Sequence, residues 1–346
     1  MKKFLNIKLF YSLILMILIL VVSISCKNRK TKITICEVAH SVFYAPLYVA
    51  IELDYFNELG IEIELVNGNG ADKVMAALLS KDAQIGLMGP EASLYVYLGD
   101  QENYAINFAQ LTRTDGSFIV GREKIDNFTL QDLKGKSILG GRKGGVPEMT
   151  LEYILKQSGL IVGQDDKAVL DDGGVLVRTD VQFAAMAGAF SSGEADFTTL
   201  FEPTATNVVN NNKGYILASV GQYTGEIPYT AFCALKNYIN ENEEIIQTFT
   251  DILYKAQLWV LSHSAREVAE AIHPQFTSNT IEELTVAMEQ YKLINAWSNN
   301  PFFSELALEN LMKIMIEANE LDKNVLTKNI YKDIVTTKYA LNSMNN

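Results

Sequence analysis

The sequence predicts an α/β fold with two lobes of similar plan. A pattern of strand, loop and helix with short connections runs through residues 31–98, and part of it recurs later in the chain. The length of 346 residues is enough for two compact domains, and an apolar content of 48% excludes a disordered chain. The net charge of −12 argues against a nucleic-acid partner, because an acidic surface repels phosphate backbones.

The alternation of apolar and polar residues and the positions of Pro and Gly define the first elements. Ile33 and Ile35 alternate with polar neighbours, which is typical of a strand, and Pro46 stands where the first turn of a helix tolerates it. Gly60 ends that helix. The expected strands are 31–37, 61–65 and 84–88, and the expected helices are 44–59, 72–80 and 91–98.

One block of this pattern occurs twice, at an offset of 112 residues. Residues 78–93 (LLSKDAQIGLMGPEAS) and 190–205 (FSSGEADFTTLFEPTA) each predict a helix end, a turn with an acid, a strand and a proline-containing break before another helix. Strand 31–37 with Pro46 is echoed by 136–139 with Pro147. Two similarities in the same order favour a repeated lobe.

From residue 241 onward the chain becomes helical in pattern. Apolar residues recur every three or four positions, as in Ile245, Phe249, Ile252, Ala256 and Trp259. We expect these helices, which continue to about residue 341, to cover the first lobe.

The N-terminus has the pattern of a secretory signal. Lysines precede an apolar run from Leu9 to Ile24, which ends at Cys26. The segment resembles a bacterial lipoprotein signal, although Ser23 stands where such signals usually carry Leu. This predicts a signal peptide over 1–25, a lipidated Cys26 and a tether over 26–32. An uncleaved N-terminal helix is the alternative, and both place the folded part outside the cytoplasm on a membrane anchor.

Cysteine and histidine usage gives no sign of a disulfide framework or a metal. Cys36 and Cys233 are far apart, so we expect buried free thiols on apolar strands. His40, His263 and His273 are scattered, and no cluster has zinc-ligand spacing. No cofactor is expected.

Five segments in order resemble the substrate-binding proteins of ABC importers. They are FYAPLYVAIELDYF (43–56), GIEIELVNGNGADKVMAALLSKDAQIGLMGPEAS (60–93), FAQLTRTDGSFIVGR (108–122), DLKGKSILGGRKGGVPEMTLEYIL (132–155) and GEADFTTLFEPTA (193–205). The nearest branch is associated with thiamine pyrimidine precursors, alkanesulfonates and nitrate. The resemblance covers about residues 31–280 and implies a fold like that of type II periplasmic binding proteins. Such a fold has two mostly parallel sheets with flanking helices and a ligand cleft between the lobes.

The resemblance also implies where the lobes divide. The chain would pass from one lobe to the other in two connecting segments, near 115–120 and near 227–235. The first lobe would then comprise residues 31–117 plus 230–346, and the second residues 118–229. Ligands of open α/β sheets bind at the carboxyl ends of strands, and hinge closure over the ligand is the expected motion.

Two glycine-containing loops are candidate ligand-binding segments. Asn69, Gly70 and Ala71 open a helix in the first lobe, and Gly144, Gly145 and Val146 are their counterparts in the second. The first N–H groups of a helix present a partial positive charge to a ligand. An ordinary tight turn and a solvated loop are the respective alternatives. The second loop lacks the Gly-Lys-Ser/Thr ending of nucleotide-hydrolysing loops.

The candidate side chains follow the same strands. His40, Ser41 and Tyr44 come after the first strand, where branch members that bind the thiamine pyrimidine carry Trp-Tyr-Pro-Asn. That departure argues against a pyrimidine ligand. A structural role is the alternative for His40.

Gly89 and four acidic or aromatic residues complete the candidate set. Gly89 and Glu91 follow one strand, Glu202 follows its equivalent, and Asp115 and Tyr229 lie on the segments that connect the lobes. A carboxylate accepts hydrogen bonds from amino and ring N–H groups and repels nitrate or sulfonate, so it favours a nitrogen heterocycle. The alternative for Glu91 and Glu202 is an interaction with the N-terminus of the helix that each begins. Tyr229 would stack on a flat ligand or pack in the core.

The predicted function is a monomeric solute-binding lipoprotein without catalysis. It would capture a small molecule, such as a pyrimidine or other nitrogen heterocycle, and deliver it to the permease and ATPase of an ABC importer. The alternatives are a sulfonate- or nitrate-type anion binder of the same system, an enzyme, and a module that feeds a sensor or surface adhesion. The pyrimidine-synthesising relative of this fold has a cysteine-rich cluster that this chain lacks.

Overall fold

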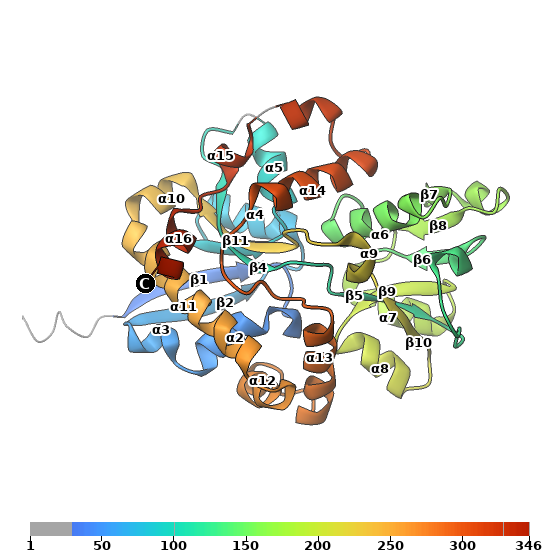
Figure 1. Cartoon of the computed structure of the whole chain (residues 1–346), viewed down its shortest axis with the longest axis horizontal. Coiled ribbons are helices and arrows are strands. Elements are labelled where there is room, and N and C mark those ends of the chain that lie inside the picture. Colours follow the sequence, from blue (N-terminus) through green and yellow to red (C-terminus); the bar gives the residue numbers. More distant parts are fainter. Residues whose placement is uncertain (1–29, 100, 328, 346) are drawn as a thin grey trace, which may run out of the picture.

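Two β-sheets form the centre of the molecule. The computed structural model describes residues 30–99, 101–327 and 329–345, in which the sheets lie side by side with helices around them (Figure 1). The first sheet has the order β2-β1-β3-β11-β4, with β1 (Thr31–Glu37), β2 (Ile61–Asn67), β3 (Ile85–Met88), β4 (Ala105–Thr112) and β11 (Thr230–Leu235). The second has the order β10-β5-β9-β6-β8-β7, with β5 (Ser117–Gly121), β6 (Ser137–Leu139), β7 (Val162–Gln164), β8 (Val175–Arg178), β9 (Phe197–Phe201) and β10 (Tyr215–Ser219).

The two sheets share one plan. Strands β1, β3, β11 and β4 of the first sheet occupy the same order as β6, β9, β5 and β10 of the second. Within each, one strand, β11 or β5, runs antiparallel to both neighbours, while the other described pairs are parallel. Each antiparallel strand is the first that the chain forms after passing from the other sheet. The α/β class and the mostly parallel sheets are therefore confirmed.

The repeated block predicted from sequence is also present. Helix α4 (Ala71–Ser80), β3 and α5 (Glu91–Leu98) have the same order as α7 (Met186–Ser192), β9 and α8 (Thr204–Asn210). The prediction of a single helix over 44–59 is wrong. This segment is divided into η2 (Val42–Tyr44), α2 (Ala45–Glu52) and α3 (Tyr55–Glu58), because Asp54 adopts a left-handed φ of 60° that ends the helical path.

Further helices flank the second sheet. They are α6 (Val146–Gln157) and α9 (Gly221–Thr224), with the short turns η3 (Leu130–Leu133), η4 (Lys167–Leu170) and η5 (Phe183–Ala185). Pro147 stands in the first turn of α6, as expected. The largest apolar core cluster includes residues of both sheets, so the two halves are packed together in this structure.

The C-terminal helices contact both halves. They are α10 (Lys236–Glu241), α11 (Glu243–Ser262), α12 (Ala265–Ile272), α13 (Ile281–Leu293), α14 (Glu305–Glu317), α15 (Tyr331–Ile334) and α16 (Lys338–Asn345), with η6 (His273–Gln275) and η7 (Lys323–Thr327). Helix α11 packs on α2 as predicted, but α13 packs on α8 and α14 on α6 (Figure 1). Lys156 of α6 donates to the carbonyl of Glu317 at the end of α14 (2.7 Å). The expectation that these helices cover the first half alone is therefore wrong.

The prediction that Cys36 and Cys233 are buried free thiols on strands is confirmed. Cys36 in β1 and Cys233 in β11 are buried and free. In the described part of the chain, no group of three or more His, Cys, Asp or Glu side chains could hold a metal ion. None of the helices within residues 30–345, as described, has both the length and the apolar character needed to cross a bilayer. The predicted signal and Cys26 lie outside the described residues, and residues 31 and 32 of the predicted tether belong to β1.

Candidate functional site

The carboxyl ends of strands from both sheets meet at one place. The ring of Phe43, after β1, lies 5.4 Å from the ring of Phe201, the last residue of β9. The hydroxyl of Tyr95 in α5 donates to the carbonyl of Gly144 after β6 (3.3 Å). The backbone N–H of Glu202 donates to the hydroxyl of Tyr291 in α13 (3.0 Å). We call this region the junction; it comprises residues 40–44, 89–91, 113–116, 140–148, 201–202 and 225–229, with the side chains packed on them.

Two connections join the sheets at the junction, residues 113–116 and 225–229. They lie side by side, since the N–H of Ile227 donates to the carbonyl of Arg113 (3.0 Å) and Arg113 pairs with Glu226 (2.6 Å). At the edge of the first sheet the hydroxyls of Thr112 and Thr230 are 2.6 Å apart. A motion of one sheet relative to the other would pass through these two short segments.

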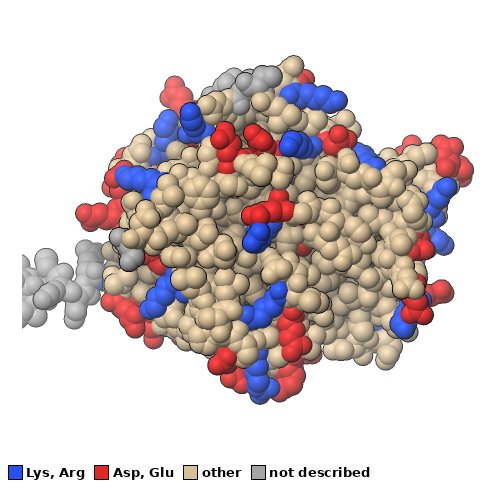
Figure 2. Space-filling view, viewed as in Figure 1, with Lys and Arg blue, Asp and Glu red and all other residues tan. Residues whose placement is uncertain are grey.

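Aromatic side chains fill the centre of the junction. The ring of Phe43 contacts those of Tyr229 (5.8 Å) and Tyr291 (5.0 Å), and all three residues are buried. Gly116 makes this packing possible, because a Cβ there would lie 2.4 Å from the Phe43 ring. On the face shown in Figure 2, charged side chains lie mostly toward the margin, and few lie over the centre.

Glu91 is the predicted acid that has one carboxylate oxygen without a hydrogen-bond partner among the described residues. The residue is only 3% exposed, and its Oε2 has no hydrogen-bond partner among the described residues. The carboxylate folds back over Gly89, where an added Cβ would lie 2.0 Å from Oε2. Burial raises the pKa of Glu91 to about 7, although the charge of Arg142 and the amides at the start of α5 oppose the shift.

Asp115 is engaged within the protein. Its Oδ1 accepts hydrogen bonds from the N–H (2.7 Å) and the hydroxyl (2.6 Å) of Ser117, and its Oδ2 accepts one from the hydroxyl of Thr150 in α6. Burial nevertheless raises the pKa of Asp115. This acid therefore fastens the first connection to α6.

Glu202 caps the helix that follows it, and Glu148 is engaged by the loop before α6 and by β7. Both oxygens of Glu202 accept hydrogen bonds from Thr206, one from its N–H (2.9 Å) and one from its hydroxyl (2.8 Å). Glu148 accepts hydrogen bonds from the N–H of Gly144 (3.0 Å) and from the side chain of Gln164 (2.6 Å). Burial raises the pKa of each glutamate. For Glu202, the geometry is that of the alternative named from sequence, an acid at the N-terminus of its own helix.

His40 is held on both sides of its ring. Nδ1 lies 2.7 Å from Oε1 of the buried Glu37, and Nε2 lies 3.0 Å from the carbonyl of Gln275 in η6. Since both partners are acceptors, both nitrogens can donate only in the protonated ring, and the bond to Glu37 raises the pKa of His40. The ring also stacks on Phe276 (4.6 Å). These contacts are those of a structural histidine.

Ser41 and Tyr44 have separate roles near His40. The hydroxyl of Ser41 accepts a hydrogen bond from the N–H of Phe43 (3.3 Å) and so caps η2. Tyr44 is buried beside the junction, and burial, with the charges of Glu37 and Glu91, raises its pKa.

The two glycine loops differ in what they contact. Asn69 is exposed, and Gly70 donates its N–H to the carbonyl of Val38 (3.0 Å) just before the buried Ala71, so these bonds stay within the first half. By contrast, Gly144 contacts Tyr95 of the other half, and Gly145 and Val146 are buried at the start of α6. The structure therefore brings the second loop, but not the first, into described contact across the junction.

Tyr291 and Phe201 were missed by the sequence reasoning. Phe201 directly precedes Glu202 and ends a strand, so its position carried a usable signal. Tyr291 lies 89 residues after Glu202 in a helix of the C-terminal region, where no local pattern marks it.

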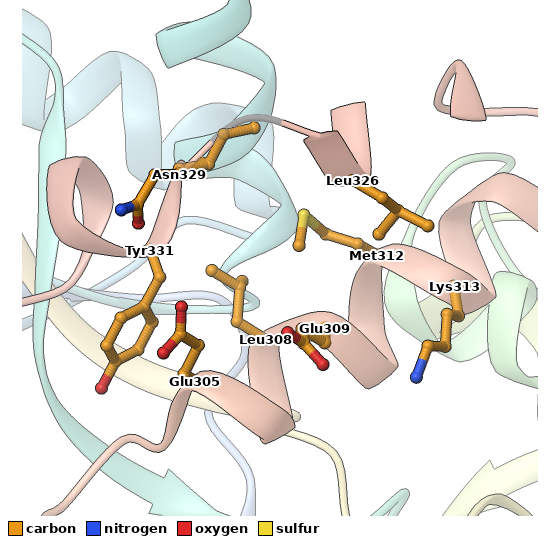
Figure 3. Close-up of a pocket in the computed structure, with 9 residues that line it drawn as sticks. Glu305, Leu308, Glu309, Met312, Lys313, Leu326, Asn329 and Tyr331 are labelled. Atoms are coloured by element: carbon orange, nitrogen blue, oxygen red, sulfur yellow. The ribbon is translucent and has the colours of Figure 1, made fainter. Parts of the chain in front are cut away.

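A pocket of about 360 Å³ lies away from the junction (Figure 3). It is lined by Glu305, Leu308 and Met312 of α14 and by Leu326, Asn329 and Tyr331 of the following segment. None of the site residues predicted from sequence lines it.

Comparison with known proteins identifies the family. The model of the NMT1-like family matches residues 27–273. The chain is 39% identical over 303 residues to "Putative binding protein YtlA" of Bacillus subtilis (strain 168), covering 87% of this chain and 88% of the relative.

Solved structures show the same fold at low sequence identity. The periplasmic nitrate-binding protein NrtA of Synechocystis PCC 6803 superposes with a TM-score of 0.71 at 15% identity, covering 91% of this chain and 89% of that one. The alkanesulfonate-binding protein SsuA of Xanthomonas axonopodis pv. citri gives 0.66 at 16% identity, covering 88% and 98%. The chain belongs to the NMT1-like family and has the type II periplasmic binding protein fold.

Proposed function

We propose that the protein is the extracytoplasmic solute-binding component of an ABC importer, anchored through a lipid on Cys26. Residues 31–117 plus 230–346 and residues 118–229 act as two lobes that close on a small solute. The observation that carries the proposal is the junction, where strand ends of both sheets meet around the buried carboxylate of Glu91, whose Oε2 has no hydrogen-bond partner among the described residues. A solute between the lobes would supply the missing partner, and the importer's permease and ATPase would receive it.

The proposed solute is a small nitrogen heterocycle. Buried carboxyl groups gather at the junction in Glu91, Asp115, Glu148 and Glu202. Their charge disfavours an anion in the same space, whereas N–H groups of a heterocycle would complement it. The buried aromatic rings of Phe43 and Tyr229 favour a flat molecule.

A thermal-shift screen of the full chain in detergent tests solute capture. We expect one class among pyrimidines, flavins, alkanesulfonates and nitrate to raise the Tm, because a ligand that binds only the native state stabilises it by about 2.7 kcal/mol at one hundred times its Kd. A nitrogen heterocycle, rather than nitrate or a sulfonate, is the expected hit. If no compound shifts the Tm and native mass spectrometry finds no retained solute, the proposed function is contradicted.

Replacing Cys26 with Ser tests the anchor. We expect the variant to move from the detergent phase to the aqueous phase in a Triton X-114 partition, because the thiol that carries the lipid is gone. Cys36→Ala is the matched control, since that cysteine is buried in β1 and its loss leaves the anchor intact. Detergent-phase partitioning of the Cys26 variant would contradict lipidation and favour an uncleaved N-terminal helix.

A further inference from the structure

We infer that Glu91 selects the solute, and that the site takes a molecule which offers an N–H donor to this carboxylate and rejects oxyanions. The inference rests on the proposed function, since it assumes that a solute is enclosed at the junction. It names Glu91 as the residue that discriminates between solutes, and the N–H donor as the group that a solute must carry.

The first step is that one oxygen of the Glu91 carboxylate is unsatisfied, although the amides of Glu91 and Ala92 donate to the carboxylate. Its Oε2 is buried without a hydrogen-bond partner among the described residues. Buried polar groups in native proteins are nearly always paired, and an ionised carboxylate is the most costly group to leave alone. The other acids of the junction, Asp115, Glu148 and Glu202, do have partners. Glu91 is thus the acid at which a ligand donor replaces a missing interaction.

The second step concerns the places where an oxyanion would bind. Free N–H groups at helix N-termini are the usual anion sites of an α/β cleft. Here Glu202 takes the N–H of Thr206 in α8, and Glu148 takes the N–H of Gly144 before α6. The carboxylate of Glu91 itself lies over Gly89 at the start of α5. An oxyanion would have to displace these carboxylates and would meet their charge.

The third step is the set of groups around Glu91. Tyr44, Tyr229, Tyr95, Cys233 and Arg142 interact electrostatically with it. Burial raises the pKa of the tyrosines and of Cys233, so they stay neutral near pH 7 and add no negative charge. The exposed Arg142 offsets part of the charge of Glu91 from the loop after β6. The carboxylate therefore remains the strong acceptor that a ligand meets.

The experiment compares two probe classes on the full chain in detergent. Benzamidine and 4-aminopyrimidine present N–H donors, and nitrate and ethanesulfonate are oxyanions. Affinities are measured by calorimetric titration at pH 8 and pH 6 for the wild type, Glu91→Gln and the control Glu64→Gln. Native mass spectrometry of the wild type as purified identifies any retained solute.

We expect the nitrogen bases to bind the wild type and the oxyanions not to bind. Glu91→Gln should weaken benzamidine about thirtyfold at pH 8, the usual effect of losing a hydrogen bond to a charged group. Glu64→Gln is the control, because this acid is exposed in β2 and bonded to Thr34 and Lys32, and it should change the benzamidine affinity less than about threefold. Because benzamidine stays cationic, its affinity for the wild type should fall about tenfold from pH 8 to pH 6 as Glu91 takes up a proton.

Three results would overturn the inference. Equal benzamidine affinity in wild type and Glu91→Gln would show that Glu91 does not contact the solute. If the variant does not fold, a wild-type affinity that is the same at pH 8 and pH 6 would show it instead. Binding or retention of an oxyanion leaves solute capture intact but refutes the selection rule. Absence of any binding and of any retained solute refutes solute capture and the inference together.

Discussion

Raising the pH from 5 to 8 is expected to lower the free energy of unfolding by about 2–3 kcal/mol through Glu91 alone. Burial raises the pKa of this carboxyl from 4.5 to about 7 in the folded protein, so the folded state holds the proton more tightly than the unfolded state does. The favourable contribution is complete below the unfolded pKa and is lost as the pH rises through 7. Asp115, Glu148 and Glu202, whose pKa values burial also raises, act in the same direction.

Urea unfolding of the full chain at pH 5, 6, 7 and 8 measures this effect. The Glu91→Gln variant cannot ionise at this position, so its unfolding free energy should fall less over the same range, by the amount assigned to Glu91. Glu64→Gln is the control, because Glu64 is an exposed acid whose pKa its bonds to Thr34 and Lys32 lower. Identical pH dependence in wild type and Glu91→Gln would show that Glu91 is ionised in the folded protein at all these pH values.

Local sequence signals were sufficient for most of the elements expected over residues 31–98. Strand β1 and helix α5 have the expected bounds, since alternation defines one and the Gly89-Pro90 break begins the other. The division of the helix over 44–59 at Asp54 was not predicted, because no Gly or Pro marks it and Asp adopts the left-handed conformation only at single positions. The position of β11 between β3 and β4 depends on pairing between residues far apart in the chain, so periodicity could not predict it.

In the candidate site, the positions of the acids could be predicted from the sequence, but their hydrogen-bond partners could not. Following the strands placed Glu91, Glu202 and Asp115 at the junction, because carboxyl ends of parallel strands share an edge. Whether an acid has free oxygens depends on its partners, and the partner of Asp115 in α6, Thr150, lies 35 residues away. For His40, the partner Gln275 lies 235 residues away, so its structural role could not be read from its neighbours.

Replacing Phe43 with Ala is expected to cost about 3–5 kcal/mol of folding stability, the usual range for a fully buried phenylalanine, and to abolish solute capture. The ring is 0% exposed and contacts Tyr291 and Tyr229 as well as Phe201 of the second sheet. Its loss would leave a cavity between the two halves and remove the surface on which Gly116 packs. Urea unfolding gives the stability, and the Tm shift caused by the nitrogen base that stabilises the wild type gives solute capture.

Phe108→Ala is the control for Phe43→Ala, because it removes a buried core ring without changing the junction. Phe108 is equally buried, but it lies in β4 against Phe249 of α11, within the first half. We expect a similar loss of stability with the ligand-induced Tm shift retained, because the junction is unchanged. If both variants lose the shift, solute capture depends on the general stability of the first half. If Phe43→Ala keeps the full shift, the aromatic centre of the junction does not hold the solute, since a ligand enclosed there could not bind unchanged after the ring beside it is removed.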